Sequence, residues 1–196
     1  MEFNKLGSVC VYCGSSGNVN PAFRQVATDV GTLLAKEGIR LVYGGGHVGL
    51  MGLVADSVMQ NGGQVTGIIP HFLDQLEVGH PGLTELIKTE NMHDRKMRMA
   101  ELSDGFIVLP GGLGTLDETF EILTWKQLKL HDKPIVILNT EGYWDHLIEL
   151  IHHQVAENFA KQAHLDLFTV ATSAEEAITQ LRMSAPAHHQ LNSKWT

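Results

Sequence analysis

The amino-acid sequence predicts a Rossmann-like α/β fold, with helices on both faces of a doubly wound parallel sheet. Two observations support this prediction. Short apolar runs alternate with helical patterns along the 196 residues, as expected for repeated strand–helix units. The runs are apolar at consecutive positions, which is typical of strands buried on both faces. Together they predict three layers, α/β/α.

The expected strands span residues 8–12, 39–43, 64–69, 85–89, 104–109, 134–138 and 166–170. The expected helices span residues 20–37, 49–61, 92–102, 115–130, 142–158 and 173–182. We see no linker and no internal repeat, so we expect a single domain over residues 1–182. Periodicity is lost from Ala185 onward, and residues 183–196 are predicted to form a flexible tail.

Composition limits the classes of function. Hydrophobic residues make up 43% of the chain and charged residues 18%, as in a globular protein. We expect a cytoplasmic protein, because no apolar stretch approaches the roughly 20 residues that span a bilayer and no secretory signal is visible. The formal net charge of −8 argues against a general nucleic-acid binder. A small phosphorylated ligand remains compatible with it.

The two cysteines, Cys10 and Cys13, form a C-x-x-C pattern. Redox chemistry and half of a metal site are possible interpretations. However, an odd separation along a strand directs the two side chains to opposite faces. Since no second cysteine pair is available for zinc, we predict buried structural thiols and no metal site.

The most informative stretch runs from the apolar strand that ends at Leu109 to Glu118. It contains Pro110, Gly111, Gly112, Leu113, Gly114, Thr115, Leu116 and Asp117. Glycines let the backbone approach a ligand closely, and a helix start presents free N–H groups to an anion. A carboxylate in the first helical turn adds a chemical group to a phosphate cradle. The stretch therefore predicts a nucleotide-processing site.

Glu118 also has a structural interpretation. Thr115 and Glu118 have the spacing of a capping box, in which each side chain satisfies backbone N–H groups of a helix start. The two roles are compatible, because the positive helix end is expected to keep Glu118 ionised. An ionised, fixed carboxylate suits a reaction that builds positive charge on a sugar.

Two further glycine-rich loops follow predicted strands. Residues 13–17 include Ser15, and a plain turn explains this loop as well as a ligand contact does. Gly44, Gly46 and Gly49 satisfy G-x-G-x-x-G, a dinucleotide-binding pattern. The match is weak, because no acid ends the next strand to bind a ribose. We interpret Gly44–Gly46 as an anion-binding nest, with a structural turn as the alternative.

Arg95 lies on the apolar side of the predicted helix 92–102, three residues after Met92. A guanidinium there costs desolvation unless it meets an anion. The alternatives are that it reaches the surface or pairs with an acid. Lys96 and Arg98 are compatible with simple solvation. Since all strand-to-helix loops of a parallel sheet lie at one edge, we expect these features to converge there.

Taken together, the motifs resemble the signature of the LOG (Lonely Guy) family, cytokinin riboside 5′-monophosphate phosphoribohydrolases once labelled possible lysine decarboxylases. The likeness covers roughly residues 8–180. Its central motifs are Met92-His93-x-Arg95-Lys96 and Pro110-Gly111-Gly112-x-Gly114-Thr115-x-x-Glu118, with further matches at residues 13–16, 43–52 and 67–70. The resemblance implies a Rossmann-like homodimer that needs no cofactor.

The resemblance also implies roles for residues. Arg95 and Glu118 match the catalytic pair of the family. Implied substrate-binding positions are Ser15, Gly45, Gly46, Glu77, Lys96, Gly111, Gly112, Leu113, Gly114, Thr115, Leu116, Asp117 and Thr124. Plant members usually carry Glu at the position of Asp117 and often Gln at that of Asp94, which leaves the base preference open.

The implied reaction hydrolyses the N-glycosidic bond of a purine nucleoside 5′-monophosphate, giving the free base and ribose 5-phosphate. The base is adenine or an N6-substituted adenine. Glu118 is then a cation stabiliser, a ribose ligand or a general base. The alternative is a non-catalytic carrier of a nucleotide or of molybdenum cofactor. A nucleotide-dependent oxidoreductase and a pyridoxal-phosphate decarboxylase are disfavoured, for lack of a ribose acid and of a lysine motif.

Overall fold

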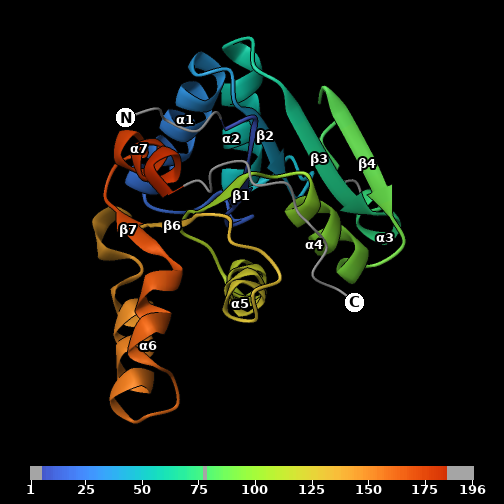
Figure 1. Ribbon diagram of the computed structural model, residues 1–196. Helices are drawn as coiled ribbons and strands as arrows, with labels where there is room; N and C mark the ends of the chain where they lie inside the picture. The colour runs from blue at the N-terminus through green and yellow to red at the C-terminus, as the bar shows by residue number, and fades with distance from the viewer. Residues whose placement is uncertain (1–5, 77–78, 185–196) are drawn as a thin grey trace.

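The computed structural model describes residues 6–76 and 79–184. Over these residues a sheet of seven strands is flanked by helices (Figure 1). The strands are β1 (Ser8–Tyr12), β2 (Arg40–Tyr43), β3 (Val65–Pro70), β4 (Glu85–Thr89), β5 (Gly105–Val108), β6 (Ile135–Leu138) and β7 (Thr169–Ala171). The α-helices are α1 (Pro21–Lys36), α2 (Gly49–Gln60), α3 (His71–Asp74), α4 (Met92–Glu101), α5 (Leu113–Gln127), α6 (Asp145–Ala156) and α7 (Ala174–Ser184).

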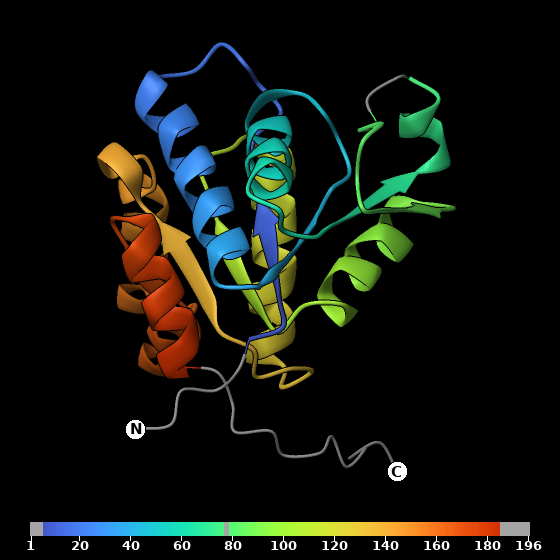
Figure 2. The ribbon, with the colours of Figure 1, turned by 90° about the horizontal axis from the view of Figure 1, so that it is seen from above.

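The strand order is β4-β3-β2-β1-β5-β6-β7, and every neighbouring pair is parallel. The chain builds outward from β1 to β4 and then returns to place β5 on the other side of β1 (Figure 2). The carboxyl ends of β1 and β5 therefore form the switch point of the sheet. Ligands of open α/β sheets bind at this point.

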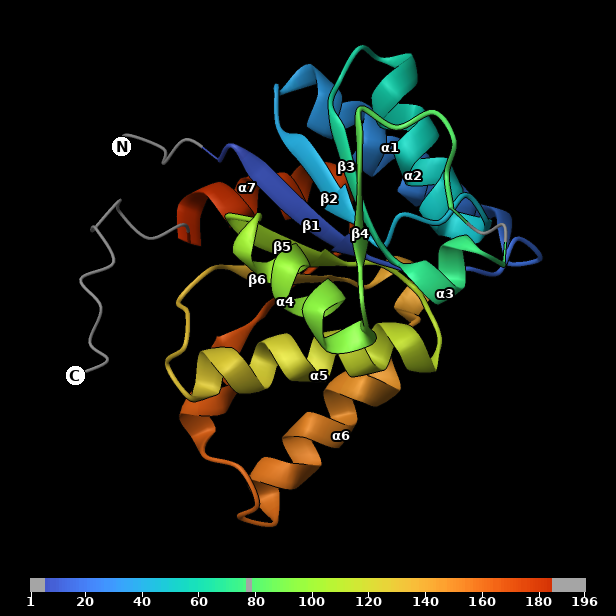
Figure 3. The same ribbon diagram turned by 90° about the vertical axis from the view of Figure 1, so that its right-hand side faces the viewer.

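Two apolar cores hold the helices against the sheet. Side chains of β1 point alternately to the two faces of the sheet: Val9 and Val11 belong to one core, and Cys10 and Tyr12 belong to the other. Helices α1, α2 and α7 pack into the first core, and α4, α5 and α6 into the second (Figure 3). Because both faces are covered, the strands are apolar at consecutive positions. The prediction of a doubly wound, three-layer α/β/α fold is confirmed.

Some boundaries differ from the expected ones. Helix α5 begins at Leu113, two residues before the expected start. Residues 162–167 form a 3-10 helix, η2, which displaces the start of β7 from the expected residue 166 to Thr169. Helix α7 continues past residue 182 to Ser184. The rest of the expected tail, residues 185–196, lies outside the described residues.

Cys10 and Cys13 are free and buried, each in a different core. Burial raises the pKa of both thiols. Since the thiolate is the reactive form, this environment disfavours redox chemistry and agrees with structural thiols.

Among the described residues, none of the helices has the length and apolar character needed to cross a membrane.

Candidate active site

The guanidinium of Arg95 lies beside the carboxyl end of β2 and the carboxyl-terminal half of β3. Its helix, α4, is capped by Asn91, whose side chain accepts a hydrogen bond from the N–H of Asp94 at 2.9 Å. Arg95 Nε donates to the carbonyl of Ile68 at 3.2 Å, and Nη2 donates to that of Gly44 at 3.5 Å. Backbone carbonyls of β3 and of the loop after β2 thus hold the side chain of Arg95, a residue that is only 8% exposed.

Gly44 makes room for this guanidinium. A Cβ atom at residue 44 would lie 1.9 Å from Arg95 Nη2. Any other amino acid at this position would therefore displace the tip of the arginine. The close approach of the Arg95 guanidinium therefore explains why a glycine occupies position 44, the first residue after β2.

The carboxylate of Glu118 is the anionic partner of Arg95. Arg95 Nη2 lies 3.4 Å from Glu118 Oε1, and Glu118 is also 8% exposed. The ion pair joins α4 to α5, two helices whose sequences are separated by β5. Pairing with an acid, one of the alternatives for Arg95, is therefore the arrangement observed. Reaching to the surface, the other alternative, is wrong, because the side chain is enclosed.

Burial raises the pKa of Glu118 from its ordinary value of 4.5 to about 7, although the charge of Arg95 opposes the shift. Asp117 and Glu121 raise this pKa further, and Lys96 lowers it. The expectation that Glu118 is kept ionised holds only in part, since desolvation outweighs the favourable charges and leaves the carboxyl group partly protonated near pH 7. A carboxyl group that exchanges its proton near pH 7 is suited to acid–base chemistry.

Lys96 is bound to two acidic side chains of α5. Its Nζ lies 3.0 Å from Asp117 Oδ2 and 3.2 Å from Glu121 Oε1. Burial lowers the pKa of Lys96, but these hydrogen bonds outweigh it and the pKa is raised. Simple solvation is thus wrong for Lys96, whereas Arg98 pairs with Glu101 at the surface. Glu121 was missed by sequence reasoning, although its spacing of four from Asp117 places both acids on one helix face.

The glycine-rich loop after β5 leads directly into α5. Gly112 precedes the first turn, and the N–H of Leu116 donates to its carbonyl at 3.0 Å. The N–H groups at this helix start have no partner within the helix. Thr115 is the third residue of the helix and Glu118 the sixth, and no side chain caps the end. The predicted capping box is therefore wrong, because the extended Gly112 starts the helix before Thr115.

The loops after β1 and β5 contact each other at the switch point. The N–H of Gly14 donates to the carbonyl of Pro110 at 3.0 Å. Gly111 has no room for a side chain, since a Cβ there would lie 2.1 Å from Thr115 Oγ1 and 2.9 Å from the nitrogen of Gly14. The expected convergence of these loops is confirmed.

The loop after β2 joins the same edge. Gly49 has φ +62°, and a Cβ there would lie 2.4 Å from the carbonyl oxygen of Ser15. The carbonyl of Gly45 accepts from the N–H of His80 at 2.8 Å, and Gly46 forms a bridge with Gly79. These backbone contacts account for Gly45 and Gly46 as structural residues. Their contact with a phosphate, like that of Ser15, stays a prediction.

The other predicted substrate-binding residues are distributed along α5. Gly112, Leu113 and Gly114 are exposed at its start, with Leu113 85% exposed, and Leu116 is half-buried. Thr124 is exposed six residues beyond Glu118, which is about 9 Å along the helix axis. Helix α5 therefore places Thr124 apart from the ion pair. Glu77 lies outside the described residues.

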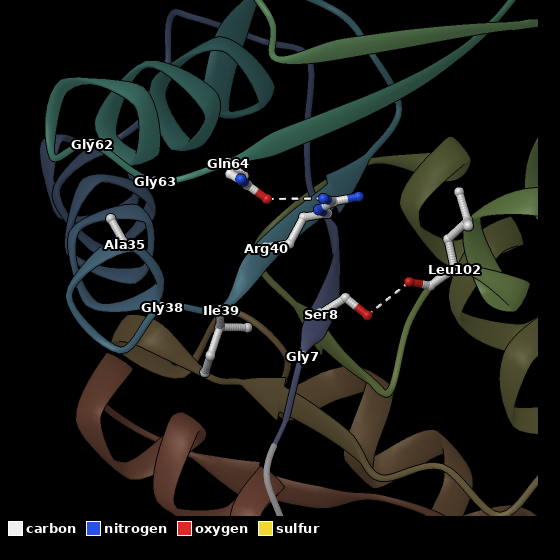
Figure 4. A pocket seen from close by; sticks show the side chains of 10 residues that line it. All are labelled: Gly7, Ser8, Ala35, Gly38, Ile39, Arg40, Gly62, Gly63, Gln64 and Leu102. Atoms are coloured by element: carbon white, nitrogen blue, oxygen red, sulfur yellow. Dashed lines mark hydrogen bonds between the residues drawn. The ribbon is translucent and has the colours of Figure 1, made fainter.

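A pocket of about 510 Å³ lies at the opposite edge of the sheet, at the amino ends of β1 and β2 (Figure 4). Its lining includes Ser8, whose hydroxyl donates to the carbonyl of Leu102, and Arg40, which donates to the side chain of Gln64. None of the predicted site residues lines it. This pocket is therefore separate from the candidate site, which lies where the loops after β1 and β5 meet.

Within residues 6–76 and 79–184, no group of three or more His, Cys, Asp or Glu side chains is arranged to hold a metal ion.

The fold and the site define a Rossmann-like α/β protein with a buried arginine–glutamate pair beside a glycine-rich helix start. A family model described as "Possible lysine decarboxylase" matches residues 51–181. The cytokinin riboside 5′-monophosphate phosphoribohydrolase LOG3 of Arabidopsis thaliana is 41% identical over 194 residues, covering 99% of this chain and 90% of that protein. The probable phosphoribohydrolase LOGL9 of Oryza sativa subsp. japonica is 42% identical over 183 residues, covering 93% and 81%.

The chain therefore belongs to the LOG family of cytokinin riboside 5′-monophosphate phosphoribohydrolases. Among solved structures, the Moco carrier protein of Chlamydomonas reinhardtii has a TM-score of 0.69 at 20% identity, covering 92% of this chain and 98% of that one. This likeness shows the shared fold.

We predict that Gly44→Ala displaces the guanidinium of Arg95 and leaves the fold intact. The atom in the way is the far end of a flexible side chain, so the backbone need not move. Loss of the nearby positive charge should raise the pKa of Glu118 above its value of about 7. A carbon-detected NMR titration of the Glu118 carboxyl group measures this shift. Gly82→Ala is the matched control, because the nearest atom to its added Cβ is at 3.6 Å; equal titrations of the two variants would contradict the prediction.

We also predict that Glu118→Gln changes the pH dependence of stability. The folded protein binds the Glu118 proton more tightly than the unfolded chain, so its relative stability falls as pH rises from about 4.5 to 7. The variant lacks this loss. Its free energy of unfolding, relative to that of the parent, should therefore rise by about 3 kcal/mol between pH 4 and pH 8. Chemical denaturation at both pH values measures the difference. A gap that stays constant with pH would show that the pKa is not raised.

Proposed function

We propose that this chain hydrolyses the N-glycosidic bond of purine nucleoside 5′-monophosphates whose base is adenine or an N6-substituted adenine. Water adds its oxygen to C1′ of the ribose, and the base leaves with the bonding electrons and takes up a proton. The products are the free base and ribose 5-phosphate. Membership in the LOG family makes the chain a hydrolase. The proposed substrate class is inferred from its relatives, which are cytokinin riboside 5′-monophosphate phosphoribohydrolases.

One observation carries the proposal: the contact of 3.4 Å between Arg95 and Glu118 beside the glycine-rich start of α5. A helix start and its N–H groups suit a 5′-phosphate. Binding energy from this remote phosphate would place C1′ next to the carboxyl group of Glu118.

Glu118 has the chemistry that the bond cleavage requires. As the base departs, the ribose acquires oxocarbenium character, as in glycoside hydrolysis. An ionised Glu118 would stabilise this cation, hold ribose hydroxyls or activate the water. With a pKa of about 7, Glu118 also accepts a proton near neutral pH. Arg95 would orient Glu118 or the phosphate, because a guanidinium is a poor proton donor near neutrality.

The remaining residue roles are proposed from the family resemblance. The phosphate and ribose would contact Gly111, Gly112, Leu113, Gly114 and Thr115, which surround the helix start. Lys96 and Asp117, which form an ion pair with each other, would contact the substrate beside these residues. Water alone serves as the second substrate, so no cofactor is proposed. A cytoplasmic location stays a prediction from the sequence.

A homodimer is proposed as well. Exposed apolar side chains lie on three helices that pack into the second core: Met97 of α4, Leu113 of α5 and Leu150 of α6. Exposed apolar residues of this kind are typical of protein interfaces. The molar mass in solution, compared with the chain mass of 21.6 kDa, tests the proposal.

The carrier alternative is tested by the same assay as the enzyme. A molybdenum-cofactor carrier shares the fold at 20% identity, whereas the phosphoribohydrolases share 41%. Release of adenine from AMP by the purified protein separates a hydrolase from a carrier. The ratio of kcat/KM for AMP and for isopentenyladenosine 5′-monophosphate then gives the base preference.

We expect Glu118→Gln to lower kcat for AMP by about 10²–10⁴-fold, because it removes the charge and the proton acceptor. AMP binding should remain close to that of the parent, since the phosphate contacts are unchanged. Steady-state kinetics and calorimetry measure the two effects. Glu101→Gln, an exposed position on α4, is the matched control and should keep parental kinetics. An unchanged kcat in Glu118→Gln would refute the role of this residue.

A further inference from the structure

Tyr143 lies outside the family motifs and contacts the glycine-rich loop. It follows β6 and the short 3-10 helix η1 (Thr140–Gly142). Its hydroxyl donates a hydrogen bond of 2.7 Å to the carbonyl of Gly111. This bond joins positions 32 residues apart in the chain, and it reaches the loop immediately before α5.

Two aromatic side chains hold the ring of Tyr143. Phe23, near the start of α1, meets it edge-to-face, with ring centroids 5.2 Å apart and planes at 75°. Trp144 meets it in the same manner, at 4.8 Å and 84°. Edge-to-face contacts are a favoured geometry of aromatic pairs. The ring is therefore fixed on two sides although Tyr143 is 41% exposed.

The backbone before Tyr143 is also constrained. Glu141 and Gly142 both have positive φ, 55° and 68°, a conformation that a non-glycine residue such as Glu141 rarely adopts. The Asn139 side chain holds this turn by accepting from the N–H of Trp144 at 2.7 Å and donating to Asp145 at 2.7 Å. A strained backbone held by several contacts is typical of functional sites.

The hydrogen bond to Gly111 has a consequence for the next N–H group. In a trans peptide, the carbonyl of one residue and the N–H of the following residue point in opposite directions. A carbonyl of Gly111 held on Tyr143 therefore fixes the N–H of Gly112 away from Tyr143. We infer that Tyr143 is a positioning residue of the phosphate site, which orients the Gly111–Gly112 peptide so that its N–H group serves the ligand's phosphate.

This inference rests on the proposed function, and Tyr143→Phe tests it. The variant keeps the ring and its two aromatic contacts and removes only the hydroxyl. We expect KM for AMP and the Kd for inorganic phosphate to rise about fivefold, the effect of one hydrogen bond, with kcat within twofold of the parent. Tyr43→Phe is the matched control, because this buried hydroxyl has no hydrogen-bond partner among the described residues. It should leave all three constants unchanged.

The outcomes separate the two proposals. A purely structural role of Tyr143 would lower the melting temperature and leave the Kd for phosphate unchanged, which overturns the inference. Equal Kd values for phosphate in the parent and in Tyr143→Phe overturn it too, as does a parent that binds no phosphate. A parent that binds phosphate but releases no base from AMP contradicts the proposed function only. In that case the phosphate titration still decides the role of Tyr143.

Discussion

The buried ion pair between Arg95 and Glu118 is the interaction on which the candidate site depends. Removing two charged groups from water is costly unless each finds a partner. Here the partner of the guanidinium comes from another helix, and the backbone carbonyls of Ile68 and Gly44 accept hydrogen bonds from its N–H groups. Gly44 leaves the space that this arrangement needs. Lys96, bound to Asp117 and Glu121, holds the same two helices together one residue further along α4.

The strand order explains why residues so far apart in sequence meet. Since β5 returns to pair with β1, the loops that follow these two strands lie side by side and lead to helices on opposite faces. Gly14 and Gly111 are in contact because of this arrangement. Helix α4 then brings Arg95 across the ends of β2 and β3. A phosphate at the start of α5 would be one and a half turns of helix from Glu118, at about 3.6 residues per turn.

Patterns of hydrophobicity predicted the fold well, because burial of both sheet faces leaves consecutive apolar positions in each strand. They also placed Arg95 on an inward side of its helix, where a buried charge demands a partner. The start of α5 was not predictable from capping patterns, since Gly112 has no side chain to signal it. The raised pKa of Glu118 depends on enclosure by distant elements, which local sequence does not record. Tyr143 carried no signal because its partner is a backbone carbonyl.

A double-mutant cycle on AMP hydrolysis tests most directly whether Arg95 and Glu118 act as one unit. Turnover would be compared in the parent, in Arg95→Gln, in Glu118→Gln and in the double variant. If the pair functions together, Arg95→Gln should cost much less in the Glu118→Gln background than in the parent. Independent effects, in which the free-energy costs of the two single variants add in the double variant, would contradict the account.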